Sequence, residues 1–415
     1  MRMGMRAGVL IGVLVVAGCS SEADPCEGVT GKCIGLTSGA STTEVQTALI
    51  EIETGGTIAF GEGTFEMTSD LSLDVDGVTL VGKGMDKSIL SFKKQTSGAQ
   101  GILVTSDNFT AHDFAIEDTK GDALKVLGGV GVTMQKLRVE WTGGPKETNG
   151  SYGLYPVQCK KVLIEDSVVK GASDAGIYVG QTDTIVVRGN RAELNVAGIE
   201  IENSTHADVH DNVATTNTGG ILVFNLPGLE IANGAMTTVH DNQVFDNNTE
   251  NFAPAGNIVG KVPTGTGVVV LAAHQVEIFR NTIKDHKAVN LGMISYVPIG
   301  SVNDPKYDQY PTAIHIHDNT MSGVSNMPTG ELGAALITAI GEIHPQGPFI
   351  TPDIAWDGVL DPQRTPGNPA EKICIHDNGD ANFMNLSWPL SEGALPTEDL
   401  APHACTLPAV PAVTL

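Results

Sequence analysis

A short apolar motif that begins with glycine recurs along the chain, and this repeat constrains the fold more than any other feature. Four copies start at Gly153, Gly176, Gly198 and Gly220, which are 23, 22 and 22 residues apart, and a fifth starts at Gly267 after an insertion. Each copy alternates apolar side chains as a strand does. A period in the low twenties with this alternation predicts one coil of a parallel β-solenoid per repeat.

A second column of residues follows the same period. In six places an apolar residue precedes asparagine by three positions, which gives Asn190, Asn212, Asn242, Asn281, Asn319 and Asn378. Neighbouring coils lie roughly 4.8 Å apart, so equivalent side chains touch and buried asparagines can form a hydrogen-bonded ladder. We expect a second ladder from Gln158, Gln181, Asn203 and Asn225, at the turn after the first strand of each coil.

The two columns predict an all-β chain that forms a single-stranded right-handed parallel β-helix. Ser41 and Glu44 form a capping-box pattern that opens a short helix through Ile52, and this helix would cover the open edge of the first coil. Its apolar face is Val45, Ala48, Leu49 and Ile52. Long loop insertions are expected towards the C-terminus at 226–236, 246–266, 286–313 and 322–372. The last is rich in proline and glycine, so we expect no regular coil in it.

The first residues carry an export signal. A short basic segment precedes an apolar stretch that is too short to span a bilayer and that ends in Val16-Ala17-Gly18-Cys19. These four residues resemble a bacterial lipobox. The resemblance implies cleavage before Cys19, lipidation of Cys19, and, because Ser20 follows, delivery to the outer membrane of the cell envelope. An ordinary cleaved signal peptide with a chance cysteine is the alternative.

The cysteines and the composition divide the chain further. Export permits disulfides, and we expect the pairs Cys26–Cys33 and Cys374–Cys405, with Cys159 as a buried thiol. We therefore expect a lipoprotein signal peptide at 1–18, an anchor stem at 19–40, the β-helix at 41–385 and a proline-rich tail at 386–415. The net charge of −24 argues against a nucleic-acid partner, since such proteins concentrate lysine and arginine. We expect a monomer.

The chain resembles the pectate-lyase-like superfamily of right-handed parallel β-helices. The capping helix and the segments Gly-Gly-Thr-Ile58 and Gly77-Val-Thr-Leu-Val-Gly-Lys-Gly84 are typical of its carbohydrate-active members. More closely, segments 152–157, 174–181, 195–203, 217–228 and 251–254 resemble a group of bacterial β-helix-repeat lipoproteins of unassigned function. The resemblance covers most of the mature chain and supports the fold. It does not specify the chemistry, because one fold hosts many functions.

The motif Gly198-Ile-Glu-Ile-Glu-Asn203 carries the strongest candidate site. Alternation places Glu200 and Glu202 on the outer face of one strand, roughly 6.5–7 Å apart, which is near the lower separation for the acid and base of an inverting glycoside hydrolase. Neighbouring coils would add the substrate-binding candidates Tyr155, Asp174, Tyr178, Asn203, Phe224 and Asn225. The same carboxylates, with Asp174, are hard oxygen ligands that could bind calcium. Solvated surface glutamates are the alternative.

A second candidate is an outward column beside the asparagine ladder. It contains His112, Arg188, His210, His240, His317 and His376, and the histidines precede Asp113, Asp211, Asp241, Asp318 and Asp377. Stacked imidazoles could bind a transition metal. His-Asp-Asn is also a natural way to turn a corner of a coil, because Asp and Asn side chains bond the local backbone.

Three functions remain open from the sequence. The first is a carbohydrate-binding or carbohydrate-active protein, of lyase, hydrolase or epimerase type, with its site on the first sheet. The second is a non-catalytic envelope scaffold or adhesion module whose loops between 246 and 372 bind a protein partner. The third is a metal-handling periplasmic protein. Whether the chain is an enzyme is not decided by the sequence.

Overall fold

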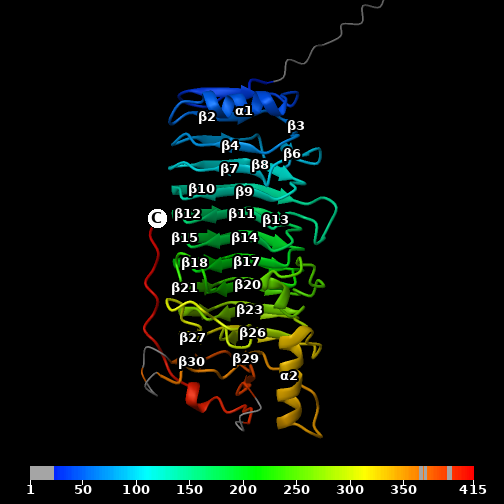
Figure 1. Ribbon diagram of the computed structural model, residues 1–415, viewed down its shortest axis with the longest axis vertical. Coiled ribbons are helices and arrows are strands. Elements are labelled where there is room, and N and C mark those ends of the chain that lie inside the picture. The colour runs from blue at the N-terminus through cyan, green and yellow to red at the C-terminus, as the bar shows by residue number, and fades with distance from the viewer. Residues whose placement is uncertain (1–22, 364–367, 369–371, 390–394) are drawn as a thin grey trace, which may run out of the picture.

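The computed structural model describes residues 23–363, 368, 372–389 and 395–415. The expected signal peptide and the lipidation candidate Cys19 lie outside the described residues. Parallel strands stack along the long axis of the molecule as one right-handed β-helix, as the repeat predicts (Figure 1). In the described part of the chain, neither α-helix has the length and apolar character of a membrane span.

Each regular coil contributes one strand to a first sheet and two to a second, larger sheet. The 11-stranded first sheet consists of β4 (Leu71–Leu73), β7 (Gln100–Val104), β9 (Asp122–Leu127), β11 (Tyr152–Val157), β14 (Ala175–Gly180), β17 (Ala197–Glu202), β20 (Gly219–Phe224), β23 (Thr266–Leu271), β26 (Val289–Ile294), β29 (Ile354–Trp356) and β31 (Phe383–Asn385). Equivalent apolar residues of these strands, such as Ile177, Ile199 and Ile221, stack in the interior and are fully buried.

The second sheet bends around the rest of each coil. Its 20 strands are β1 (Cys33–Leu36), β2 (Thr57–Phe60), β3 (Gly63–Glu66), β5 (Thr79–Val81), β6 (Ser88–Ser91), β8 (Thr110–Glu117), β10 (Val130–Glu140), β12 (Lys160–Glu165), β13 (Val168–Lys170), β15 (Asp183–Arg188), β16 (Arg191–Glu193), β18 (Thr205–His210), β19 (Val213–Thr215), β21 (Ala235–His240), β22 (Gln243–Phe245), β24 (His274–Phe279), β25 (Thr282–Lys284), β27 (Thr312–His317), β28 (Thr320–Ser322) and β30 (Ile373–His376). β1 precedes the capping helix and pairs with β2, which follows that helix.

The ends of the β-helix are closed as the sequence predicts. Helix α1 (Thr42–Glu51) covers the N-terminal end, and the side chains of Ser41 and Glu44 form the expected capping box (Figure 1). Val45, Ala48, Leu49 and Ile52 are all buried. The disulfides Cys26–Cys33 and Cys374–Cys405 are both present, and Cys159 is a buried free thiol.

Two of the four expected insertions contain strands. β26 lies inside 286–313, and β29 lies inside 322–372, where we expected no regular coil. Each of these two segments thus adds a strand to the first sheet, and that strand pairs an edge that would otherwise be open. The segment 322–372 also forms helix α2 (Gly330–Ile343), while the short 3₁₀ helices η1 (Ile258–Lys261) and η4 (Ala401–His403) lie in the loop before β23 and in the C-terminal tail.

The predicted asparagine ladder is confirmed. The side-chain amide of each asparagine donates to the amide oxygen of the next, at 2.9–3.0 Å, from Asn190 through Asn212, Asn242, Asn281 and Asn319 to Asn378. Each of these oxygens also accepts the backbone N–H of the preceding asparagine. All six side chains are buried, so the ladder satisfies polar groups inside the stack.

The second predicted ladder is wrong. Gln158, Gln181 and Asn203 have left-handed backbone conformations, and their side chains bond the loop that follows β20 instead of one another; Asn203 Nδ2, for example, donates to the carbonyl of Leu226 at 2.9 Å. A ladder forms instead at another corner. There the side-chain amide of Asn195 donates to the side-chain oxygen of Asn217, that of Asn217 donates to Asn247, and Asn247 contacts His286. The side chains of Gln158, Gln181 and Asn203 thus bond a long loop, where the repeat predicted bonds to the equivalent residues of neighbouring coils.

Candidate functional site

Glu200 and Glu202 project from β17 on the face of the first sheet that points away from the core. In the register of the sheet, Tyr178 and Leu222 flank Glu200, and Gly180 and Phe224 flank Glu202. These are the neighbours that the repeat predicts. The alternate residues Ile199 and Ile201 face the core and are buried.

This face is not open to solvent, contrary to the expectation of an exposed surface. Glu200 is only 1% exposed, Glu202 6% and Phe224 2%. The loops before β23 and after β26 fold over the sheet, and their apolar side chains, including Val259, Val262 and Tyr307, pack with Tyr178 and Phe224 in a second apolar cluster. Apolar loop residues gain by this burial, so the expected surface becomes an interior.

Three buried carboxylates meet beneath these loops. The side chains are those of Asp174, Glu200 and Glu202, and we call them the carboxylate cluster. The hydroxyl of Tyr178 donates to Oε1 of Glu202 at 2.6 Å, and Nδ2 of Asn257, in the covering loop, donates to Oδ2 of Asp174 at 2.8 Å. Oε2 of Glu200 is buried and has no hydrogen-bond partner among the described residues.

Burial makes these groups hold their protons near neutral pH. It raises the pKa of Asp174 to about 7, with a further contribution from Glu202, and it raises the pKa of Glu202 to about 7 against the opposing hydrogen bond from Tyr178. The pKa of Glu200 lies well above its usual range because it is fully buried beside the other two carboxylates. Groups with such perturbed pKa values are candidates for proton transfer.

Tyrosines line the cluster towards the N-terminal coils. The ring centroids of Tyr152 and Tyr178 are 4.3 Å apart, those of Tyr155 and Tyr178 are 5.0 Å apart, and Lys125 Nζ lies 4.6 Å from the centroid of Tyr155. Tyr152 and Tyr155 are partly exposed, so they form the accessible edge of the cluster. Asp122, also partly exposed, has a pKa raised to about 6 by burial.

Sequence reasoning missed Tyr152, Asp122 and Asn257. Continuing the repeat by two coils towards the N-terminus would have brought Tyr152 and Asp122 beside Asp174. Nothing in the sequence pairs Asn257 with Asp174, which is 83 residues away. Of the predicted residues, Tyr155, Asp174, Tyr178, Glu200 and Glu202 come together. Asn203 and Asn225 bond loop backbone instead.

A surface pocket of about 870 Å³ lies beside the covering loop, and Asn251, Asn257 and Lys261 are among its lining residues. Asn257 therefore connects this pocket to Asp174. Carboxylate oxygens are also the donors that calcium prefers, so Asp174, Glu200 and Glu202 are the residues that would hold that ion. Full ionisation of the three groups would have to accompany its binding, because burial raises the pKa of each of them.

The predicted histidine column is a continuous stack over the later coils. The rings of His210, His240, Phe279, His317 and His376 follow one another with centroids 4.7–5.3 Å apart. The Nδ1 atoms of His112, His210, His240, His317 and His376 each lie 2.6–2.9 Å from the carboxylate of the following aspartate, and Asp113, Asp211, Asp241, Asp318 and Asp377 all have left-handed backbone conformations. The histidine–aspartate pairs thus lie at the corners of the coils. Phe279 separates the stacked pair His210 and His240 from the stacked pair His317 and His376.

Three residues at and beside this column form a possible metal site. Ligand atoms of Glu277, His315 and His317 lie within 4.8 Å of one another, so these residues could hold a metal ion. His315 was not among the predicted residues, although it lies two positions before His317 on the outer face of the same strand. Its pKa is lowered to about 4 by burial and by the neighbouring His317.

The fold and the cluster together define a right-handed parallel β-helix protein with a buried acidic site on its first sheet. A family model described as the right-handed beta helix region matches residues 100–283. This match agrees with the right-handed β-helix fold of the structure. No curated protein matches the sequence of this chain.

Several solved structures are similar in fold. The A-module of mannuronan C-5 epimerase AlgE4 from Azotobacter vinelandii is 20% identical over 68% of this chain and 91% of that chain, with a TM-score of 0.48. An alginate lyase from Paenibacillus sp. str. FPU-7 is 16% identical over 68% and 99%, with a TM-score of 0.37. The pectate lyase Pel9A is 11% identical over 72% and 80%, with a TM-score of 0.40.

Proposed function

We propose that this protein cleaves a polysaccharide at the carboxylate cluster, as a glycoside hydrolase that uses Glu200 and Glu202. The observation that carries this proposal is the burial of Asp174, Glu200 and Glu202 beside one another, which raises the pKa of Asp174 and of Glu202 to about 7 and the pKa of Glu200 well above its usual range. A pair of carboxyl groups, one protonated and one ionised, supplies the acid and the base of such a reaction.

The roles follow from the protonation states. Glu200 retains its proton and gives it to the glycosidic oxygen as the bond to the anomeric carbon breaks. Glu202 is partly ionised at neutral pH and takes a proton from the water whose oxygen attacks that carbon. Carboxylates two residues apart on one strand stand roughly 6.5–7 Å apart, which leaves room for this water and implies inversion of configuration.

The tyrosines supply the contact with the sugar. Tyr152 and Tyr155 are partly exposed at the edge of the cluster, and their rings can pack against the apolar face of a pyranose. Lys125, beside the ring of Tyr155, suits an acidic sugar. The covering loop that carries Asn257 has to shift for a chain to reach Glu200.

The test is a panel of bacterial, algal and plant polysaccharides, with and without calcium, incubated with the protein and with three variants. E200Q and E202Q keep the shape of each side chain and remove its acid–base function. E165Q is the matched control, because Glu165 projects from the second sheet and pairs with Arg188 away from the cluster. Release of reducing ends and retention on each glycan are both measured.

We expect turnover of at least one polysaccharide by the wild type and by E165Q, and a loss of about 10²–10⁴-fold in kcat for E200Q and E202Q, the usual contribution of a general acid or base. Unchanged turnover in both glutamine variants would refute the assignment of Glu200 and Glu202. Binding without turnover would leave a recognition module. If the protein neither binds nor cleaves any glycan of the panel, that result would favour the alternative, a non-catalytic envelope module with a protein partner.

We also propose that the chain is a lipid-anchored protein of the outer membrane. The support is the Val16-Ala17-Gly18-Cys19 motif, followed by Ser20. Expression in a Gram-negative host with labelled palmitate, followed by membrane fractionation, tests it. Label in the outer-membrane fraction that is lost in C19A would support the anchor, and unlabelled, unanchored wild-type protein would refute it.

A further inference from the structure

A second group of converging side chains lies near the C-terminal end of the β-helix, on the second sheet. Strands β24, β27 and β30 are neighbours there, and their register places Glu277 beside His315 and, in the next column, His317 beside His376. Oε1 of Glu277 is 3.1 Å from Nε2 of His317 and 3.8 Å from Nδ1 of His315. Glu277 and His315 are both buried, with 6% and 7% of their surface exposed.

Hydrogen bonds at the far side of each ring decide which nitrogens carry lone pairs. Nδ1 of His317 lies 2.7 Å from Oδ2 of Asp318, to which it can only donate, because an ionised carboxylate accepts. In the neutral imidazole, Nε2 of His317 then carries a lone pair, and it faces the carboxylate of Glu277. The other oxygen of Glu277, Oε2, accepts the backbone N–H of Val410 at 2.8 Å, so Oε1 is the oxygen that faces the two histidines.

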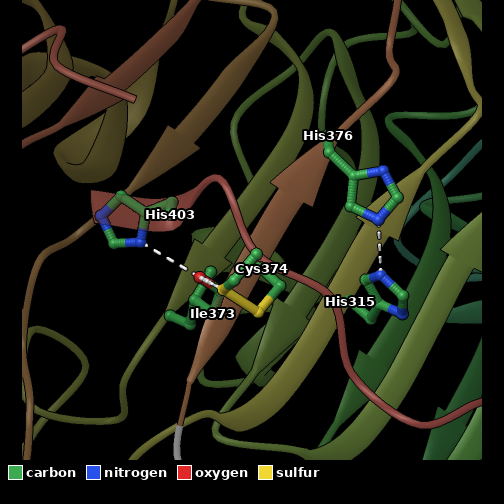
Figure 2. The surroundings of a disulfide bond; sticks show 6 residues. His315, Ile373, Cys374, His376 and His403 are labelled. Atoms are coloured by element: carbon green, nitrogen blue, oxygen red, sulfur yellow. Dashed lines mark hydrogen bonds between the residues drawn. A yellow bond between two sulfur atoms is a disulfide. The ribbon is translucent and has the colours of Figure 1, made fainter. Parts of the chain in front are cut away.

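The rings of His315 and His376 form a second pair whose proton positions are fixed in the same way (Figure 2). Nδ1 of His376 lies 2.9 Å from Oδ2 of Asp377 and donates to it, so Nε2 of His376 is an acceptor. This Nε2 is 2.9 Å from Nε2 of His315, which must therefore carry the hydrogen. Nδ1 of His315 is left with a lone pair, and in the part of the chain that the structure describes this buried atom has no hydrogen-bond partner.

In these neutral tautomers three lone-pair atoms face one another, Glu277 Oε1, His315 Nδ1 and His317 Nε2, and the ligand atoms of the three residues lie within 4.8 Å of one another. We propose that these three residues bind a divalent transition-metal ion of the zinc class. Two imidazole nitrogens and one carboxylate oxygen are a donor set that such ions accept, and aspartates that hold the far nitrogen of ligating histidines are the usual outer partners. His376 is a positioning residue, since it fixes the proton of His315.

The distances between the ligand atoms suit a zinc ion. Bonds of about 2.0–2.2 Å in a tetrahedral site place ligand atoms roughly 3.3–3.6 Å apart, and the two separations from Glu277 Oε1 lie on either side of that range. Three protein ligands leave a fourth position open. Glu277 and His315 also line a pocket of about 480 Å³ that is closed on one side by Leu407, Pro408 and Val410 of the tail, so a small ligand could reach that position.

The tail that forms this wall is covalently attached at the site. Cys405 is bonded to Cys374, which is the residue in register with His315 on the adjacent strand (Figure 2). Nδ1 of His403 lies 3.1 Å from the carbonyl oxygen of Ile373, and it is placed to donate to that oxygen. These bonds hold the segment that carries the Val410 N–H against Glu277.

The experiment is titration of the chelator-treated full chain with Zn²⁺ by calorimetry, together with the X-ray absorption spectrum of the zinc-loaded wild type. H315A and E277Q remove ligands, and E277Q is isosteric, which guards against a variant that fails to fold. H240Q is the matched control: His240 lies in the same stack and contacts Asp208 through Nε2 at 2.8 Å, but among the described residues it belongs to no group of three ligand atoms that all lie within 4.8 Å of one another.

We expect one zinc ion per chain, an affinity at least about tenfold weaker in H315A and E277Q, and wild-type affinity in H240Q, because even outer partners of metal ligands contribute roughly 10–100-fold. The absorption spectrum should show a nitrogen and oxygen shell at about 2.0–2.1 Å with two imidazoles. Absence of binding by the wild type, a spectrum without imidazole ligands, or equal loss in H240Q would overturn the proposal.

Discussion

The hydroxyl of Tyr178 reaches diagonally across the sheet to bond Oε1 of Glu202, at 2.6 Å, although the residue opposite Glu202 in the register is Gly180. The tyrosine ring occupies the space above Gly180. A Cβ atom added at Gly180 would lie 2.5 Å from a ring carbon of Tyr178 and 2.7 Å from its hydroxyl oxygen. The hydrogen bond to the buried carboxylate therefore depends on the absence of a side chain at position 180.

This relationship predicts the effect of G180A. The added methyl group should displace the ring of Tyr178, break its bond to Glu202 and lower the free energy of unfolding by about 1–3 kcal/mol, the usual cost of overpacking. Denaturant unfolding measures the change. G292A is the control, since Gly292 lies on the same sheet in the column of Tyr178 and Glu200, and a Cβ there meets only ordinary contacts at 3.9 and 4.0 Å. Equal costs for the two variants would contradict the packing argument.

The buried carboxyl groups predict a pH-dependent gain in stability for E202Q. Because burial raises the pKa of Glu202 to about 7, the native state holds its proton between the usual carboxyl pKa and about 7, where the unfolded chain has lost it. The contribution of Glu202 to stability is thus present at acid pH and is lost as the pH rises through 7. The glutamine side chain of the E202Q variant cannot ionise, so it carries no such dependence.

E202Q should therefore match the wild type at pH 4 and exceed it by about 2–3 kcal/mol at pH 8, at 1.36 kcal/mol per pKa unit. Unfolding in urea at both pH values measures the difference. E165Q, which alters a glutamate of the second sheet, should show no such gain between pH 4 and pH 8. An advantage of E202Q that is equal at both pH values would show that ionisation of Glu202 is not its cause.

The asparagine ladder predicts a large cost for N242A. Asn242 accepts from the side chain and backbone of Asn212 and donates to Val209 and Asn281, so its loss leaves several buried groups without partners. Each buried unsatisfied group costs about 1–3 kcal/mol, and we expect a total of about 3–5 kcal/mol in denaturant unfolding. Q243A, at the adjacent exposed position, should change stability by less than about 0.5 kcal/mol.

Cys159 is predicted to be unreactive in the folded protein. Burial raises the pKa of its thiol to about 11, and its sulfur contacts the carbonyl oxygens of Val126 and Val157 inside the stack. A thiol reagent at pH 8 should label no cysteine of the lipid-free protein until denaturant unfolds it, and then label one. Labelling at the rate of a free thiol in the native protein would contradict this burial.

The repeat explains why much of the site could be anticipated. Once the period was known, the register of the sheet followed, and with it the neighbours of Glu200 and Glu202, the asparagine ladder and the corner role of the histidine–aspartate pairs. Tyr152 and Asp122 lay within reach of the same reasoning. These are local relationships, because a strand in a parallel stack touches only the coils beside it.

The insertions set the limit of that reasoning. Their lengths differ, so the repeat did not indicate that the chain returns to the first sheet as β26 and β29. It also did not indicate that Asn257, far along the chain, bonds Asp174 and helps to bury it. His315 and Glu277 lie side by side because β24 and β27 pair in the second sheet, although an insertion separates them in the chain.

The sequence by itself thus determined the architecture, since equivalent residues at a constant period must stack and bury the same face in every coil. The tertiary structure decided the chemistry of the site. Whether Glu202 is a solvated surface group or a buried acid with a pKa of about 7 depends on the apolar loops that fold over it, and their contacts follow no period. Burial sets the energy of a charge, and burial is a property of the whole fold.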